Sequence, residues 1–108
     1  MWYYKNGKLV VETDVVTGNY GTNDTPKGAY SIIYKASPAT LMENSHVTFW
    51  LPFTSDGCGI HDASWRASWE YGGTRYKGHG SHGCVNTPYN AAKKIYNNIS
   101  SGTRVVVY

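Results

Sequence analysis

Helical periodicity occurs at a single place in this chain, whereas the other segments are short β-rich runs separated by turn residues. Thr87 suits the position that caps a helix, and Pro88 suits the first helical position. Apolar residues then recur at every fourth position: Ala91, Ile95 and Ile99. The Ser-Ser-Gly run that ends at Gly102 is expected to stop the helix. Because a chain of 108 residues can build one core but not two, the sequence predicts a single domain, 1–108. Its predicted fold is mostly β (β-sandwich-like mixed sheets) with one packed C-terminal helix.

The expected strands lie between turn signals. Asn6-Gly7 accepts positive φ at both positions and separates the β-rich runs 2–5 and 8–13, which predicts a two-residue hairpin. Other strands are expected at 29–35 after a turn at 25–28, at 47–51, and at 104–108, where three consecutive valines favour burial on both faces. Loops without a period are expected at 36–45 and at 62–80, the second too long for a compact domain to keep without a use.

Charge and hydropathy argue against two classes of function. The formal net charge of +3 is small and no run of basic residues occurs, so a nucleic acid is not expected as a partner. No apolar run approaches the roughly 20 residues that span a bilayer, and no signal peptide is recognisable. The two cysteines, Cys58 and Cys84, are too few for a disulfide framework, and their spacing leaves open whether they form one bridge or remain thiols.

The segment 81–86, Ser-His-Gly-Cys-Val-Asn, has the composition of a nucleophile site just before the expected helix. A thiol becomes reactive when its pKa falls, and a nearby histidine or a helix N-terminus lowers that pKa. Cys84 has His82 two residues away and the expected helix start three residues downstream. Gly83 lets the backbone approach closely, so the amides around Gly83 and Cys84 are candidates to hold an oxyanion. Cys84 is therefore the candidate nucleophile.

His61 is the candidate base for this thiol. It lies in Gly59-Ile60-His61-Asp62, at the end of an expected strand, where a sheet would hold the imidazole in place. A cysteine and its histidine need to be close in space but not in sequence. The second ring nitrogen needs an orienting acceptor. The main-chain carbonyl or the side chain of Asp62 is the nearest candidate.

His61 followed by the 81–86 motif resembles the signature of the L,D-transpeptidases, which have the YkuD-type fold. The run 25–30, Thr-Pro-Lys-Gly-Ala-Tyr, resembles that family's turn before a central strand. The run 50–53, Trp-Leu-Pro-Phe, resembles the segment that lines its substrate groove, and 61–66, His-Asp-Ala-Ser-Trp-Arg, is similar to the firmicute branch. The resemblance covers nearly the whole chain.

This resemblance implies a peptidoglycan L,D-transpeptidase that works by cysteine acyl transfer. Cys84 would attack the carbonyl of the third residue in a donor tetrapeptide stem and expel D-alanine. The side-chain amine of a second stem would then form the cross-link. His61 would carry the proton, the Asp62 carbonyl would orient its ring, and amides near Gly83 and Cys84 would hold the oxyanion. The implied substrate-binding residues are Ser81, His82, Asn86, Trp50, Phe53 and Trp65, although core packing explains the three aromatic residues equally well.

The resemblance also implies the setting in which the chain works. Its partners would be peptidoglycan stem peptides, it would need no metal or organic cofactor, and carbapenems would acylate it. A monomer is expected, located outside the cytoplasm at the cell wall or cell surface, with any export or anchor segment outside this chain. Domains of the family usually begin with a strand before the equivalent of Met1, so the domain 1–108 is expected to lack its first strand.

Three alternatives stay open. Water in place of the second amine would make the same site an L,D-carboxypeptidase or endopeptidase. A non-catalytic wall-binding module would keep the fold for recognition, but it would be expected to lose Cys84 or His61, and neither is lost. A zinc site could combine these two residues with His79 and His82. It is disfavoured because structural zinc takes recurring short ligand pairs, of which His79 and His82 supply one.

Overall fold

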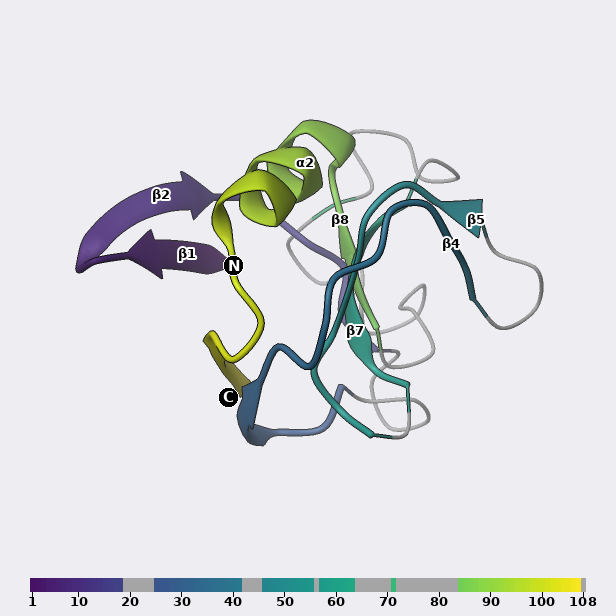
Figure 1. Cartoon of the computed structure of the whole chain (residues 1–108), viewed down its shortest axis with the longest axis horizontal. Helices are drawn as coiled ribbons and strands as arrows, with labels where there is room; N and C mark the ends of the chain where they lie inside the picture. Colours follow the sequence, from purple (N-terminus) through teal and green to yellow (C-terminus); the bar gives the residue numbers. More distant parts are fainter. Residues whose placement is uncertain (19–24, 42–45, 56, 64–70, 72–83, 108) are drawn as a thin grey trace.

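The computed structural model describes residues 1–18, 25–41, 46–55, 57–63, 71 and 84–107, and Figure 1 shows their arrangement. The elements are β1 (Trp2–Lys5), β2 (Lys8–Glu12), β3 (Gly28–Ser31), β4 (Ala39–Thr40), β5 (His46–Val47), β6 (Trp50–Pro52), β7 (Gly59–Asp62), β8 (Val85–Thr87), α2 (Tyr89–Asn98) and β9 (Arg104–Val107). Within the described part, strands dominate and α2 is the one helix. The predicted fold class is confirmed.

The centre of the molecule is a mixed sheet in the order β6-β7-β8. β6 and β7 are antiparallel, with Leu51 opposite Ile60. β7 and β8 are parallel, with Ile60 opposite Val85. A parallel pair needs a long connection between its strands. The segment between β7 and β8 is therefore the crossover that the sheet requires, and Cys84 stands where it enters β8.

The hairpin at the N-terminus forms as predicted. β1 and β2 pair antiparallel, and the turn between them has positive φ at Asn6 (54°) and Gly7 (77°). Both values suit the two-residue turn that matches the twist of a hairpin. β2 ends at Glu12, and the chain then reaches the central sheet, where Val16 and Asn86 exchange main-chain hydrogen bonds of 2.9 and 2.8 Å.

The strand predicted at 29–35 is shorter, and the strand predicted at 104–108 more exposed, than the sequence indicates. β3 pairs with β9 only as far as Ser31. The chain then changes partners, because the Ile32 amide donates to Thr103 and the Ile33 amide donates to Pro52. The predicted burial of β9 on both faces is wrong. In the described part of the chain β9 pairs with β3 in a two-stranded sheet, and the Val106 side chain of β9 is 57% exposed.

The predicted helix forms, but its predicted N-terminal cap is wrong. α2 begins at Tyr89 with Pro88 at the cap position, and Thr87 makes no cap because its Oγ1 donates to the Val85 carbonyl within β8. At the other end, the Lys35 ammonium donates to the carbonyls of Tyr96 (2.8 Å) and Ile99 (3.1 Å). A cation at this end complements the negative pole of the helix.

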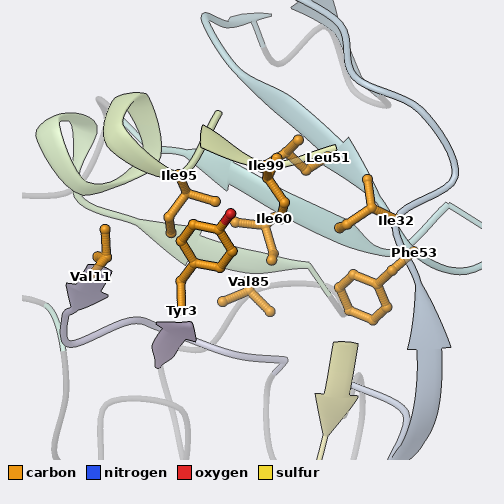
Figure 2. Packing of buried hydrophobic residues seen from close by; sticks show 9 residues of the cluster. All are labelled: Tyr3, Val11, Ile32, Leu51, Phe53, Ile60, Val85, Ile95 and Ile99. Carbon is orange, nitrogen blue, oxygen red and sulfur yellow. The ribbon is translucent and has the colours of Figure 1, made fainter. Parts of the chain in front are cut away.

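The hydrophobic core lies between α2, the hairpin and one face of the central sheet, as Figure 2 shows. Its buried members are Tyr3, Val11, Ile32, Leu51, Phe53, Ile60, Val85, Ile95 and Ile99. α2 packs against β2 and β7, so the helix holds the sheet that carries His61. Among the described residues, no helix has the length and apolar character needed to cross a membrane.

Replacement of Ile95 by alanine tests this packing. Ile95 is 1% exposed at the centre of the cluster, so Ile95→Ala should lower the free energy of unfolding by about 2–5 kcal/mol. Urea denaturation followed by circular dichroism measures the change. Lys94→Ala, at the exposed neighbouring position, is the matched control and should change stability by less than about 0.5 kcal/mol. Equal effects of the two variants would contradict this account of the core.

Candidate active site

The pleat of the central sheet separates a core face from an opposite face that carries the predicted site. Ile60 and its partners Leu51 and Val85 belong to the core cluster. Side chains alternate between faces along a strand, so His61 and its register partners Trp50 and Asn86 lie on the other face. Cys84 directly precedes Val85, just outside β8, and its sulfur contacts the main chain of Gly57 and Gly59, beside the start of β7. Asn86, the residue opposite His61, follows Cys84 by two positions, which corresponds to roughly 7 Å of extended chain.

His61 is buried, and one of its ring nitrogens is held by the main chain. The side chain is 4% exposed, and Nδ1 lies 2.7 Å from the Asp62 carbonyl oxygen. A carbonyl can only accept, so Nδ1 carries the hydrogen and the lone pair of the neutral ring is on Nε2. Burial lowers the pKa of the imidazole below its ordinary value of 6.5, while the hydrogen bond and the negative charge of Asp62 oppose that shift. The neutral ring required of a base is therefore favoured at neutral pH.

The carboxylate of Asp62 does not orient His61; it is bound to another part of the chain. Its Oδ1 accepts from the amides of Thr48 (2.9 Å) and Phe49 (2.8 Å), and Oδ2 accepts from the Thr48 amide (3.2 Å). These two residues lie between β5 and β6, where a continuous strand 47–51 was predicted. Because the carboxylate takes their amide hydrogens, the strand is interrupted there. Of the two candidate acceptors for His61, the structure shows the main-chain carbonyl.

Cys84 is partly buried at the edge of the site. Its Sγ donates a 3.5 Å hydrogen bond to the Gly57 carbonyl. Burial raises the pKa of the thiol above its ordinary value of 9.0; a main-chain hydrogen bond at Gly59 opposes this shift, and the nearby Cys58 adds to it. The expected help from a helix N-terminus is absent because three residues of β8 and Pro88 separate Cys84 from α2. Among the described residues, the thiol is favoured over the thiolate.

Trp50 covers part of this face. Its side chain is 6% exposed, and its ring centroid lies 5.9 Å from that of His61 at an interplanar angle of 44°. The indole Nε1 donates to the hydroxyl of Tyr34 at 3.2 Å. The six-membered ring rests against Gly59, since a Cβ on that residue would lie 2.7 Å from Cη2 and Cζ3 of the indole. Trp50 thus lies against both the candidate base and the residue beside the thiol.

The remaining predicted residues divide into three groups. Asn86 is 2% exposed in β8 and is held through its main chain by Val16. Phe53 is 3% exposed in the core cluster, 5.5 Å from the Tyr30 ring, so its side chain is turned away from the His61 face. Ser81, His82, Gly83 and Trp65 lie outside the described residues.

Sequence reasoning missed the role of the segment 57–59. Gly57 supplies the carbonyl that accepts from Cys84, and Gly59 supplies the main-chain contact to the same sulfur. The available signal was the Gly-Cys-Gly pattern at 57–59, in which two residues without side chains come shortly before His61. Cys58 between them packs against the core cluster, and neither cysteine takes part in a disulfide.

The cavity found beside the sheet does not contain the candidate site. It has a volume of about 240 Å³ and is lined on the core side by residues that include Tyr3, Phe53, Ile60 and Val107. Its described lining includes neither Cys84 nor His61. No group of three or more histidine, cysteine or acidic side chains in the described part of the chain is arranged to hold a metal ion.

Comparison with known proteins decides the family. The family model of the L,D-transpeptidase catalytic domain, YkuD, matches residues 1–107. The chain belongs to this family. A comparison with curated proteins gave no match.

Solved structures of L,D-transpeptidases share the fold. A crystal structure of an Enterococcus faecium L,D-transpeptidase cysteine-to-serine mutant is 41% identical with a TM-score of 0.91, over 99% of this chain and 44% of that one. The NMR structure of the E. faecium catalytic domain is 40% identical with a TM-score of 0.84, over 99% of this chain and 87% of that one. A Stackebrandtia nassauensis L,D-transpeptidase is 30% identical with a TM-score of 0.78, over 99% of this chain and 49% of that one. This chain therefore spans about half of the longer proteins it matches.

The depressed pKa of His61 gives the stability of the L,D-transpeptidase domain a predictable pH dependence. The unfolded chain binds a proton near the ordinary pKa of 6.5, before the buried ring does. The contribution of His61 to stability should be complete above that pH and be lost as the pH falls through the folded-state pKa. NMR titration of the ring, with its signals identified by their loss in His61→Gln, should give a midpoint below 6.5. A midpoint at or above 6.5 would contradict the effect of burial.

The Asp62 carboxylate is expected to stabilise the fold through its three hydrogen bonds to the amides of Thr48 and Phe49. Asp62→Asn removes the charge and places an amide group near the Thr48 N–H, so the free energy of unfolding should fall by about 1–3 kcal/mol. Urea denaturation measures the loss. Asp14→Asn, at an exposed position, is the control and should stay within about 0.5 kcal/mol of the unmodified domain. An Asp62→Asn domain as stable as the control would show that these hydrogen bonds contribute little.

Proposed function

We propose that this domain cross-links peptidoglycan by acyl transfer through Cys84, with His61 as the base. The observation that carries the proposal is the parallel register of β7 and β8. It supports the pairing because Ile60 lies opposite Val85, so Cys84, the residue before Val85, comes next to Gly59, two residues before His61; the Asp62 carbonyl leaves the basic lone pair of His61 on Nε2. A buried neutral imidazole and a neutral thiol are the resting state from which a proton can pass to the base as the sulfur attacks.

The reaction has two halves. In the first, Sγ of Cys84 bonds to the carbonyl carbon of the third residue of a tetrapeptide stem, and the bond to the terminal D-alanine breaks. The thiol proton passes to Nε2 of His61 and then to the leaving amine. In the second half, the side-chain amine of another stem attacks the thioester, the C–S bond breaks, and the amine's proton returns through His61 to the sulfur.

Other residues are proposed to support these steps. Main-chain amides around Gly83 and Cys84 would hold the oxyanion, and Ser81, His82, Asn86 and Trp65 would shape the pocket for the donor stem. The proposed reaction needs no cofactor, because the nucleophile and the base come from the chain itself. A wall substrate places the proposed site of action outside the cytoplasm, with the domain acting as a monomer.

Two further observations support acyl chemistry at Cys84. The similar E. faecium catalytic domain has been solved in a form acylated by ertapenem, at 38% identity and a TM-score of 0.79 over 99% of this chain and 87% of that one. In this chain, Cys84 is only partly buried, so the nucleophile that we propose is open to an acyl donor. We therefore expect ertapenem to acylate this domain on Cys84.

Mass spectrometry of purified tetrapeptide muropeptides tests the proposal. Incubation with the domain should release D-alanine and yield a dimer joined between third-position residues. Cys84→Ala should lower both by roughly three orders of magnitude or more, because the nucleophile is gone. Cys58→Ala is the matched control, since its thiol packs against the core, and it should retain cross-linking.

The products also separate the alternatives. Release of D-alanine without dimers would identify an L,D-carboxypeptidase that resolves the same thioester with water. No product from the folded domain, together with binding to isolated cell walls, would overturn the catalytic proposal in favour of a wall-binding module.

A further inference from the structure

Trp50 belongs to the His61 face of the central sheet, and its surroundings differ from those of the core. It is absent from the buried core cluster, although its side chain is 6% exposed. Its side chain lies against the His61 ring and Gly59 and donates to the hydroxyl of Tyr34. A large aromatic side chain buried beside a candidate base, and apart from the core, needs an explanation other than core packing.

Both ends of the indole are held in place. At one end, Nε1 donates to the Tyr34 hydroxyl at 3.2 Å. At the other, the six-membered ring lies against Gly59 at a distance that no Cβ could occupy. The backbone of Trp50 is fixed as well, since it exchanges hydrogen bonds of 2.9 and 3.0 Å with Ala36. The ring therefore has little freedom to rotate.

The indole connects the two halves of the candidate site. It packs beside the imidazole of His61, and it rests on Gly59, whose main chain contacts the sulfur of Cys84. A shift of the ring would free the imidazole to turn away from the Asp62 carbonyl. A side chain at Gly59 would push the indole out of this position.

We propose that Trp50 is a positioning residue: its indole, seated on Gly59 and anchored by Tyr34, holds the His61 ring in the orientation that presents Nε2 to the site. This proposal rests on the proposed function in one respect, namely that His61 acts as the base of the reaction. The resemblance to known sequences suggested that Trp50 lines the substrate groove. A residue in that role would contact the substrate, whereas the indole of Trp50 contacts the base.

The variant Trp50→Phe tests this role with two measurements. The smaller ring cannot fill the space beside His61 and has no N–H for Tyr34. Water should therefore reach the imidazole, and the NMR titration midpoint of His61 should rise toward 6.5, since burial is what lowers its pKa. Besides His61 itself, the titratable group on β7 is Asp62, and neither β6 nor β8 contributes one. Cys58 and Cys84 lie next to these strands and the Tyr34 hydroxyl lies at the indole, so the midpoint is read from the ring signals of His61 itself. In the muropeptide reaction, kcat should fall about tenfold while KM stays within twofold.

Two further variants keep the test decisive. Trp2→Phe makes the same change at an exposed position on β1 and should leave the His61 midpoint and both kinetic constants unchanged. Tyr34→Phe removes only the acceptor for the indole N–H, at a residue that is half exposed. It should move the midpoint and kcat in the same direction as Trp50→Phe by a smaller amount. If Trp50→Phe does not fold, the His61 midpoint and the kcat of Tyr34→Phe decide whether Trp50 positions His61.

The outcomes separate the two proposals. An unchanged His61 midpoint with a raised KM would overturn the positioning role and make Trp50 a substrate contact. A shifted midpoint in a domain that shows no acyl transfer even before substitution would support the positioning role while the proposed function fails. Unchanged midpoint and unchanged kinetics in both Trp50→Phe and Tyr34→Phe would overturn the positioning role.

Discussion

The parallel pairing of β7 with β8 is the constraint on which the rest of this domain depends. Antiparallel neighbours can be joined by a tight turn, but parallel strands need a long crossover, and here the crossover separates His61 from Cys84 in sequence. The register Ile60 opposite Val85 then brings Cys84, the residue before β8, next to Gly59, two residues before His61. α2 follows β8 directly and packs back on β7 and β2, which stabilises the sheet from its other face.

Main-chain groups of β7 and of the segment before it contact both candidate catalytic side chains. The carbonyl of Asp62 fixes the tautomer of His61, the carbonyl of Gly57 accepts from the Cys84 thiol, and the main chain of Gly59 contacts the same sulfur. The Asp62 carboxylate, in turn, ties the start of β6 to the end of β7 through the Thr48 and Phe49 amides. Backbone groups held in a sheet keep their geometry better than long side chains do, which suits a site that must hold a base and a nucleophile in register.

Burial sets the charge state of the site in the absence of substrate. It lowers the pKa of His61 and raises that of Cys84, so both shifts favour the neutral pair. A neutral pair avoids the free-energy cost of two desolvated charges. Under the proposed mechanism, charge appears only when the sulfur attacks a carbonyl, where an oxyanion site can compensate for it.

The sequence by itself determined the fold class, the hairpin at Asn6-Gly7, the apolar stripe of α2 and, through the motif at 81–86, the family. These features are local: turn chemistry and periodicity act within a few residues. The tertiary structure decided the features that depend on partners distant in sequence. It broke the predicted strand 47–51 because the Asp62 carboxylate takes the amides of Thr48 and Phe49, and it ended β3 at Ser31 because the chain changes neighbours there. It also assigned Trp50 and Phe53, three residues apart, to opposite faces of the sheet, since the pleat and register, rather than residue type, decide which face a side chain occupies.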